Sequence, residues 1–256
     1  MTRALQAGLA LVLVLALVGG GYLWLRGSSL VRVRDVEITG VTASDGDRVT
    51  AALTSAAHGM TTLHVDEDAL REATAGYSSV AGIEADADFP HTLKIRVIER
   101  KPVAALAQAG TRRVPVTGSG LLMNGVTADR DLPSLVLEKP PAGTHITDRE
   151  ILHALTVAGA APAPLLSRSN QLDVDDRGVV VVMDDGPDLV FGSDRDARAK
   201  WSAAARVLAE SSSAGATYLD LRIPGRVAAG GLAPVASPTA DPNLQPEAEN
   251  SLTLDP

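Results

Sequence analysis

Hydrophobic residues change their spacing several times between positions 30 and 100 of this chain. In Val33–Val41, Val36 and Ile38 alternate with charged or polar neighbours, which is typical of a strand with one buried face. The same alternation predicts strands at Val80–Asp86 and Thr92–Glu99. These three runs therefore indicate a small sheet.

Between the first two predicted strands the apolar spacing becomes helical. Asp47–His58 repeats its apolar residues every three or four positions, which predicts a helix with one buried face. A second helix is expected to begin after Asp66, a good N-cap, and to end at Gly76. The predicted order is strand, helix, helix, strand, strand.

A proline then interrupts the pattern within FPHTLKIRVIERKPVAAL, Phe89–Leu106. Proline fixes its own φ and lacks the N–H that a sheet ladder needs. Pro102 is therefore expected to end one sheet and to mark a domain boundary.

The second half of the chain predicts a β-rich unit with a few helices. Short strands are expected at Val103–Ala107, Arg113–Val116 and Gly120–Met123. Thr147 and Glu150 have the spacing of a capping box and predict the start of a short helix.

The run Asn170–Gly192 contains three apolar segments separated by DDRG and DDGP, which predicts an antiparallel meander. Ser193 and Asp196 are expected to cap a helix that buries Trp201. Thr217–Ile223 alternates again and predicts the final strand.

The N-terminal segment Ala4–Leu25 contains no charged residue and, as a helix, is long enough to cross a bilayer. We expect a transmembrane helix, with residues 1–3 as a cytoplasmic head and the bulk of the chain outside. A cleaved signal peptide is the alternative. The arginines just beyond the segment argue against this orientation by the charge rule, whereas the size of the C-terminal part favours it.

Composition excludes several classes of function. A net charge of −8 argues against a nucleic-acid-binding surface, and the absence of cysteine excludes disulfides and thiolate sites. Five prolines and few large apolar residues in Ala233–Pro256 predict a disordered tail. The low lysine content indicates a GC-rich bacterial genome. The five histidines lack the spacing of a metal site and are His58, His64, His91, His145 and His153.

Several linked stretches together resemble the FtsQ/DivIB family of bacterial cell-division proteins, of an actinobacterial kind. VRDVEITG resembles the family's opening strand, and FPHTLKIRVIERKPVA is similar to its Pro-x-Thr-Leu-x-x-x-Val-x-Glu-x-x-Pro-x-Ala joint. DRGVVVVMDDGPDLVFG resembles the meander, and YLDLRIPGRVAAGG resembles the closing strand.

This resemblance implies an α+β chain: a single N-terminal transmembrane helix, a β-α-α-β-β POTRA (polypeptide-transport-associated) domain at 31–100 and a mixed, mainly antiparallel β-domain with flanking helices at 101–226. It also implies a single-pass scaffold of the septum without enzymatic activity or cofactors. Implied partners are FtsB or DivIC, which adds a strand to the last strand of the β-domain, and FtsL, with FtsW and FtsI as further candidates.

Alignment to the family places partner contacts on the closing strand and on the neighbouring helix. The sequence departs from the family at Pro224, which lacks an N–H donor, and at Ser193, where proteobacterial members often have arginine. The implied partner-binding residues are Arg198, Tyr218, Arg222, Ile223, Pro224, Gly225 and Arg226.

Two other classes of function remain as alternatives. An anchored or secreted POTRA-containing module would handle extended polypeptides in transport, but such proteins usually carry tandem POTRA domains or a membrane barrel. A hydrolase would need a nucleophile motif such as Gly-x-Ser-x-Gly, which the sequence lacks.

Overall fold

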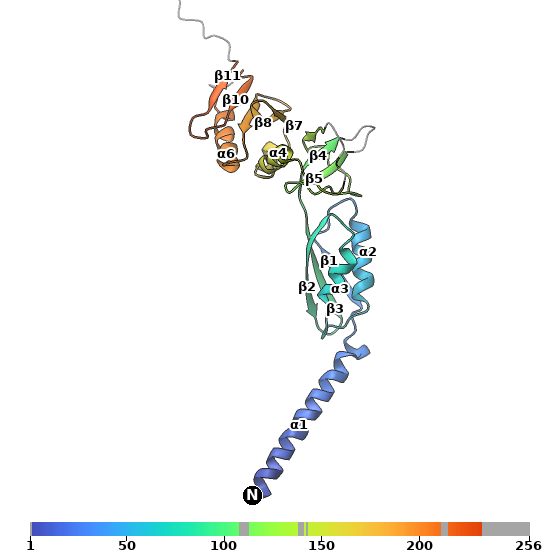
Figure 1. Cartoon of the computed structure of the whole chain (residues 1–256). Coiled ribbons are helices and arrows are strands. Elements are labelled where there is room, and N and C mark those ends of the chain that lie inside the picture. Colours follow the sequence, from blue (N-terminus) through green and yellow to red (C-terminus); the bar gives the residue numbers. More distant parts are fainter. Residues whose placement is uncertain (1, 108–112, 138–140, 142, 211–214, 232–256) are drawn as a thin grey trace, which may run out of the picture.

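The computed structural model describes residues 2–107, 113–137, 141, 143–210 and 215–231, except for the side chains of residues 2–7 and 10. The tail prediction for Ala233–Pro256 concerns residues outside these ranges. The chain begins with a long helix, α1 (Thr2–Arg26), and continues into two units with separate sheets (Figure 1). The predicted mixture of helices and sheets is therefore confirmed.

The expected helix at Ala4–Leu25 lies within α1. Nevertheless, a search of the described residues finds no helix with the length and hydropathy needed to cross a membrane, so the transmembrane prediction is not confirmed.

The first unit has the element order that the sequence predicts. Strand β1 pairs in parallel with β3, to which it is connected through two helices and β2, and β2 pairs antiparallel with β3. The strand order in this small sheet is therefore β1-β3-β2. Its elements are β1 (Asp35–Thr39), α2 (Gly46–Ala57), α3 (Glu67–Thr74), β2 (Val80–Asp88) and β3 (Thr92–Glu99).

The small sheet buries one face against α2 and α3. Leu93, Ile95 and Val97 alternate along β3 and are buried, while the residues between them are exposed. Asp66 caps α3 as expected, because its carboxylate accepts a hydrogen bond from the backbone N–H of Ala69 at 2.9 Å. In this unit the buried positions and the helix cap are therefore those that the sequence predicts.

The second unit is built around a larger mixed sheet with the order β11-β10-β9-β8-β7-β6-β4-β5. The predicted meander is confirmed, since β7, β8 and β9 pair antiparallel in sequence. The elements of this unit are β4 (Pro102–Ala107), β5 (Arg113–Thr117), β6 (Ser134–Leu135), α4 (Arg149–Gly159), α5 (Ala163–Leu166), β7 (Ser169–Asp175), β8 (Gly178–Met183), β9 (Asp188–Gly192), α6 (Ala197–Leu208), β10 (Tyr218–Asp220) and β11 (Ala228–Gly230).

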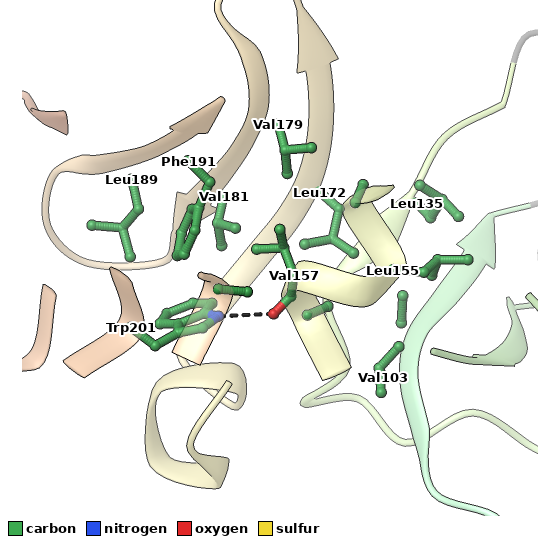
Figure 2. Close-up of a cluster of buried hydrophobic side chains, with 14 of the residues drawn as sticks. Val103, Leu135, Leu155, Val157, Leu172, Val179, Val181, Leu189, Phe191 and Trp201 are labelled. Carbon is green, nitrogen blue, oxygen red and sulfur yellow. Dashed lines mark hydrogen bonds between the residues drawn. The ribbon is translucent and has the colours of Figure 1, made fainter. Parts of the chain in front are cut away.

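Two helices, α4 and α6, cover one face of the large sheet and share its core (Figure 2). Trp201 of α6 is buried against Phe191 of β9, with ring centroids 4.8 Å apart, and its indole N–H donates to the backbone oxygen of Val157 in α4 at 2.8 Å. The Trp201 side chain therefore connects both helices to the sheet, as expected of a core residue.

Two helix starts differ from the predictions. Asp148, not Thr147, caps α4, because its carboxylate accepts from the N–H groups of Glu150 and Ile151. Asp196 precedes α6 but adopts a left-handed conformation with φ of 56° and makes no capping hydrogen bond. An N-cap residue usually has an extended backbone, which Asp148 adopts and Asp196 does not.

Candidate partner-binding site

The last sheet strands lie at the end of the molecule opposite α1 (Figure 1). Strand β10 pairs in parallel with β9 on one side and antiparallel with β11 on the other. The prediction of one exposed final strand at Thr217–Ile223 is therefore wrong in two respects: the strand stops at Asp220, and β11 covers its outer side. Among the described strands, β11 forms the edge of the large sheet.

In strand β11 a glycine stands opposite a large aromatic side chain of β10. The register places Tyr218 opposite Gly230, and a Cβ atom added to Gly230 would collide with the tyrosine ring. The backbone N–H of Thr217 donates to the Gly230 oxygen at 2.9 Å. An aromatic ring that covers a glycine of an edge strand is a known way to fix register.

The residues between the two strands form a β-turn. The N–H of Arg226 donates to the Ile223 oxygen at 2.9 Å, with Pro224 and Gly225 at the central positions. The Ile223 side chain is 60% exposed. The four predicted contact residues Ile223–Arg226 are thus brought together, but in a turn beside β11 instead of along a strand.

The two predicted arginine contacts differ in their surroundings. Arg222 donates to Oδ2 of Asp220 at 2.6 Å and to Oδ1 at 3.0 Å, and its aliphatic part packs across Gly192. The hydrogen bond from Arg222 lowers the pKa of Asp220 below its usual value. Arg198 lies exposed in the first turn of α6, and its guanidinium makes no ion pair within the described residues.

A second polar cluster lies where the two units meet. Asn124–Thr127 of the second unit contacts the first unit through three hydrogen bonds: Ser44 Oγ accepts from the Thr127 N–H at 2.7 Å, Arg48 donates to the Gly125 oxygen at 3.1 Å, and Ser78 donates to the Asn124 oxygen at 3.1 Å. The buried cores of the two units remain separate clusters. The junction is therefore polar.

Glu99 and Arg100, which lie in the stretch FPHTLKIRVIERKPVA, stabilise the segments that form this junction. The Glu99 carboxylate accepts from the N–H groups of Thr42 and Ala43 at 2.7 and 2.8 Å and so fixes the loop that carries Ser44. Burial alone would raise the pKa of Glu99, but the hydrogen bonds from Thr42 and Ala43 outweigh it and lower the pKa. Arg100 donates to the oxygens of Ser78 and Val80.

A cleft of about 630 Å³ lies beside the junction, between β2 and the segment that contains Leu121 and Asn124. No Asp, Glu or His lines it, so the described side chains offer neither a carboxylate nor an imidazole for acid–base chemistry there. Within the described residues, no group of three or more His, Asp or Glu side chains could hold a metal ion.

Comparison with known proteins identifies the family. No family model matches the sequence. The chain is 29% identical to the cell division protein FtsQ of Streptomyces collinus over 245 residues, which cover 90% of each chain. It is 30% identical to FtsQ of Streptomyces bingchenggensis over 193 residues, 72% of each chain, and 27% identical to FtsQ of Mycobacteroides abscessus over 199 residues. The chain belongs to the FtsQ family of cell division proteins.

Within this FtsQ-family chain, sequence reasoning missed β11 and the junction. Val227–Gly231 has no large side chain to alternate, so it gives no strand signal. The residue that could have indicated this strand is Gly230, because any side chain there would collide with the ring of Tyr218 opposite. Ser44, Arg48 and Ser78 contact main-chain groups, and such contacts leave no periodic pattern.

Proposed function

We propose that this FtsQ-family protein is a non-enzymatic scaffold of the divisome that binds an FtsB- or DivIC-like partner, and through it FtsL, at the division septum. Family membership supports the role in cell division. In this proposal residues 31–100 form the POTRA domain and residues 101–226, extended by β11, form the partner-binding β-domain. FtsW and FtsI are further candidate partners.

The edge of β11 is the observation that carries the proposal. An edge strand presents unpaired N–H and C=O groups to which an extended partner segment can add. The Gly230 oxygen accepts from Thr217 and therefore faces β10. Because successive residues of a strand direct their main-chain groups to opposite sides, the N–H and C=O of Ala229 face away from β10.

The surroundings of this edge fit a protein partner. Ile223 is 60% exposed and Tyr218 is 41% exposed, and both lie in the β10–β11 hairpin. Exposed aromatic and aliphatic side chains next to a free edge provide contacts for the side chains of an added strand. In the proposal Arg198 and Arg226 supply positive charge for acidic residues of the partner.

The proposal is tested with Ala229→Pro, which removes the outward N–H and leaves the N–H groups that face β10 in place. Proline is tolerated on an edge strand when its nitrogen faces solvent. We expect the purified full chain to bind the extracytoplasmic part of the FtsB-like partner at least tenfold more weakly, as measured by calorimetry. Ala229→Val keeps the N–H and serves as the matched control.

The outcome is decided by comparing the two variants. Tight binding by Ala229→Val together with weak binding by Ala229→Pro supports addition to β11. Equal affinity of the two variants rejects this mode, and Ile223→Asp then tests whether the turn is the contact instead.

The proposal also places the protein at the cell membrane. Exposed apolar side chains along α1, such as Leu11 and Leu15, support contact with lipid. Flotation of the full chain with phospholipid vesicles measures this directly. A variant that lacks α1 should remain in the soluble fraction, and failure of the full chain to float would contradict the membrane location.

A further inference from the structure

Two large apolar side chains are exposed at the end of the first unit that lies nearest α1. Leu30 lies in η1 (Ser29–Val31), immediately after α1, and is 60% exposed. Phe89 lies in the turn between β2 and β3 and is 65% exposed. Figure 1 shows that this end of the small sheet faces α1. We call this end, which comprises residues 28–32, 61–64 and 88–91, the proximal tip.

Hydrogen bonds fix the end of α1 to the proximal tip. The hydroxyl of Thr61 donates to the Arg26 oxygen at 2.8 Å, and the Arg26 guanidinium contacts the His64 ring at 2.8 Å. Ser28 caps η1 by accepting from the N–H of Leu30. The loop at 61–64 therefore joins the last turn of α1 directly to the folded unit.

The turn that carries Phe89 belongs to the same hydrogen-bonded set. The Thr62 N–H donates to the Val31 oxygen at 2.8 Å, and its hydroxyl donates to the Pro90 oxygen at 3.0 Å. The ring of His91 contacts the Arg32 oxygen at 3.1 Å. Leu30 and Phe89 thus keep a defined position relative to the end of α1.

The exposed apolar side chains of α1 indicate which kind of molecule covers the neighbouring proximal tip. Consecutive large side chains of α1 from Leu11 to Leu15 are each more than half exposed, so apolar groups lie on every side of the helix. A helix of this kind is covered by lipid or by another protein, and the membrane location proposed above favours lipid. Tyr22 and Trp24 near the end of α1 and Leu30 after it are also exposed.

We propose that the proximal tip contacts the surface of the phospholipid bilayer through Leu30 and Phe89, so that the first unit has a fixed position on the membrane. This inference rests on the membrane location in the proposed function. Aromatic side chains favour the headgroup region, and arginines can extend to the phosphates from its edge. Arg32 in the tip and Arg34 beside it are exposed, whereas Asp88 is paired with Lys94 at 2.8 Å.

Spin labels test the contact in the full chain. Because the protein has no cysteine, Leu30→Cys and Phe89→Cys each create a unique labelling site. In vesicles of phosphatidylcholine and phosphatidylglycerol, each label is compared for collisions with oxygen, which enters the bilayer, and with a nickel chelate, which stays in water. Ile98→Cys is the control, because Ile98 is 44% exposed near the other end of β3.

We expect an oxygen-to-nickel collision ratio several-fold higher at positions 30 and 89 than at position 98. With the label at position 30, Phe89→Ser should lower the ratio, whereas Ile98→Ser should leave it unchanged. Equal ratios at all three positions overturn the inference.

Flotation of the same labelled proteins separates this inference from the membrane location. Protein that floats with vesicles but gives equal ratios retains the membrane location and loses the tip contact. Protein that does not float contradicts both.

Discussion

At the scale of single residues, the buried side chain of Trp201 stabilises the second unit. Trp201 is 1% exposed and is the largest of its fully buried side chains. Its ring packs on Phe191, and its N–H reaches Val157 on a different helix. Sequence periodicity predicts that Trp201 is buried, but the hydrogen bond to α4 depends on tertiary structure and leaves no local pattern.

Trp201→Ala should destabilise the second unit by about 3–5 kcal/mol, because it opens a large cavity and removes a buried hydrogen bond. Urea unfolding followed by circular dichroism measures the loss. Trp24→Ala is the matched control, because Trp24 is 69% exposed and its replacement should leave the same transition unchanged. A loss below about 1 kcal/mol at Trp201 would contradict the packing described here.

Glu99 should make the stability of the first unit depend on pH. Hydrogen bonds lower its folded-state pKa below the ordinary value of 4.5. Its stabilising contribution is therefore complete above pH 4.5 and is lost as the pH falls through the folded-state pKa. Glu99→Gln should cost about 1 kcal/mol at neutral pH, and the difference from wild type should shrink in acid. Hydrogen exchange of the β1 and β3 amides checks this, and a pH-independent difference would refute it.

Among the elements, the hairpin of β10 and β11 is the one whose second strand the sequence pattern does not predict. The meander and the helices of the first unit are predicted correctly, because burial of one face imposes a fixed apolar spacing. Ala228–Gly230 has only small side chains, and Gly230 lies opposite Tyr218 of the preceding strand, a pairing that no local spacing indicates. Alternation extends the final strand to Ile223, whereas the Pro224–Gly225 turn ends it at Asp220.

Tyr218→Ala should loosen this hairpin without unfolding the unit. Loss of the ring over Gly230 removes a cross-strand contact that contributes about 1 kcal/mol or less. Hydrogen exchange at Ala228 and Gly230, whose N–H groups face β10, should accelerate roughly fivefold, while exchange in β8 stays unchanged. Tyr218→Phe keeps the ring and should exchange as wild type does. Unchanged exchange in Tyr218→Ala would show that the ring does not hold β11.

For the whole molecule, the polar junction sets the angle between the two units. Their cores are separate, and Ser44, Arg48 and Ser78 hold the segment Asn124–Thr127. Pro102 predicts a change of sheet at this place, and the change is observed, since β3 and β4 belong to different sheets. The angle itself depends on side chains that contact distant main-chain groups, and the sequence pattern does not reveal these contacts.

Replacing Ser44, Arg48 and Ser78 together by alanine should broaden the distribution of angles. Spin labels at Glu72→Cys and Arg149→Cys, one in each unit, report the distance by double electron–electron resonance in the otherwise cysteine-free chain. We expect a wider distance distribution, because the three hydrogen bonds are lost and the buried cores of the two units are separate clusters. Arg34→Ala is the control at a distant surface site. An unchanged distribution would mean that other contacts set the angle.

In the proposed function, this FtsQ-family protein recruits its partner to the septum through the edge of β11. The most direct measurement is the midcell fluorescence of a tagged FtsB-like partner in cells depleted of the native protein and supplied with Ala229→Pro or Ala229→Val. Both variants should reach midcell, but only Ala229→Val should recruit the partner and restore septation. Normal recruitment and septation with Ala229→Pro would contradict this mode of recruitment.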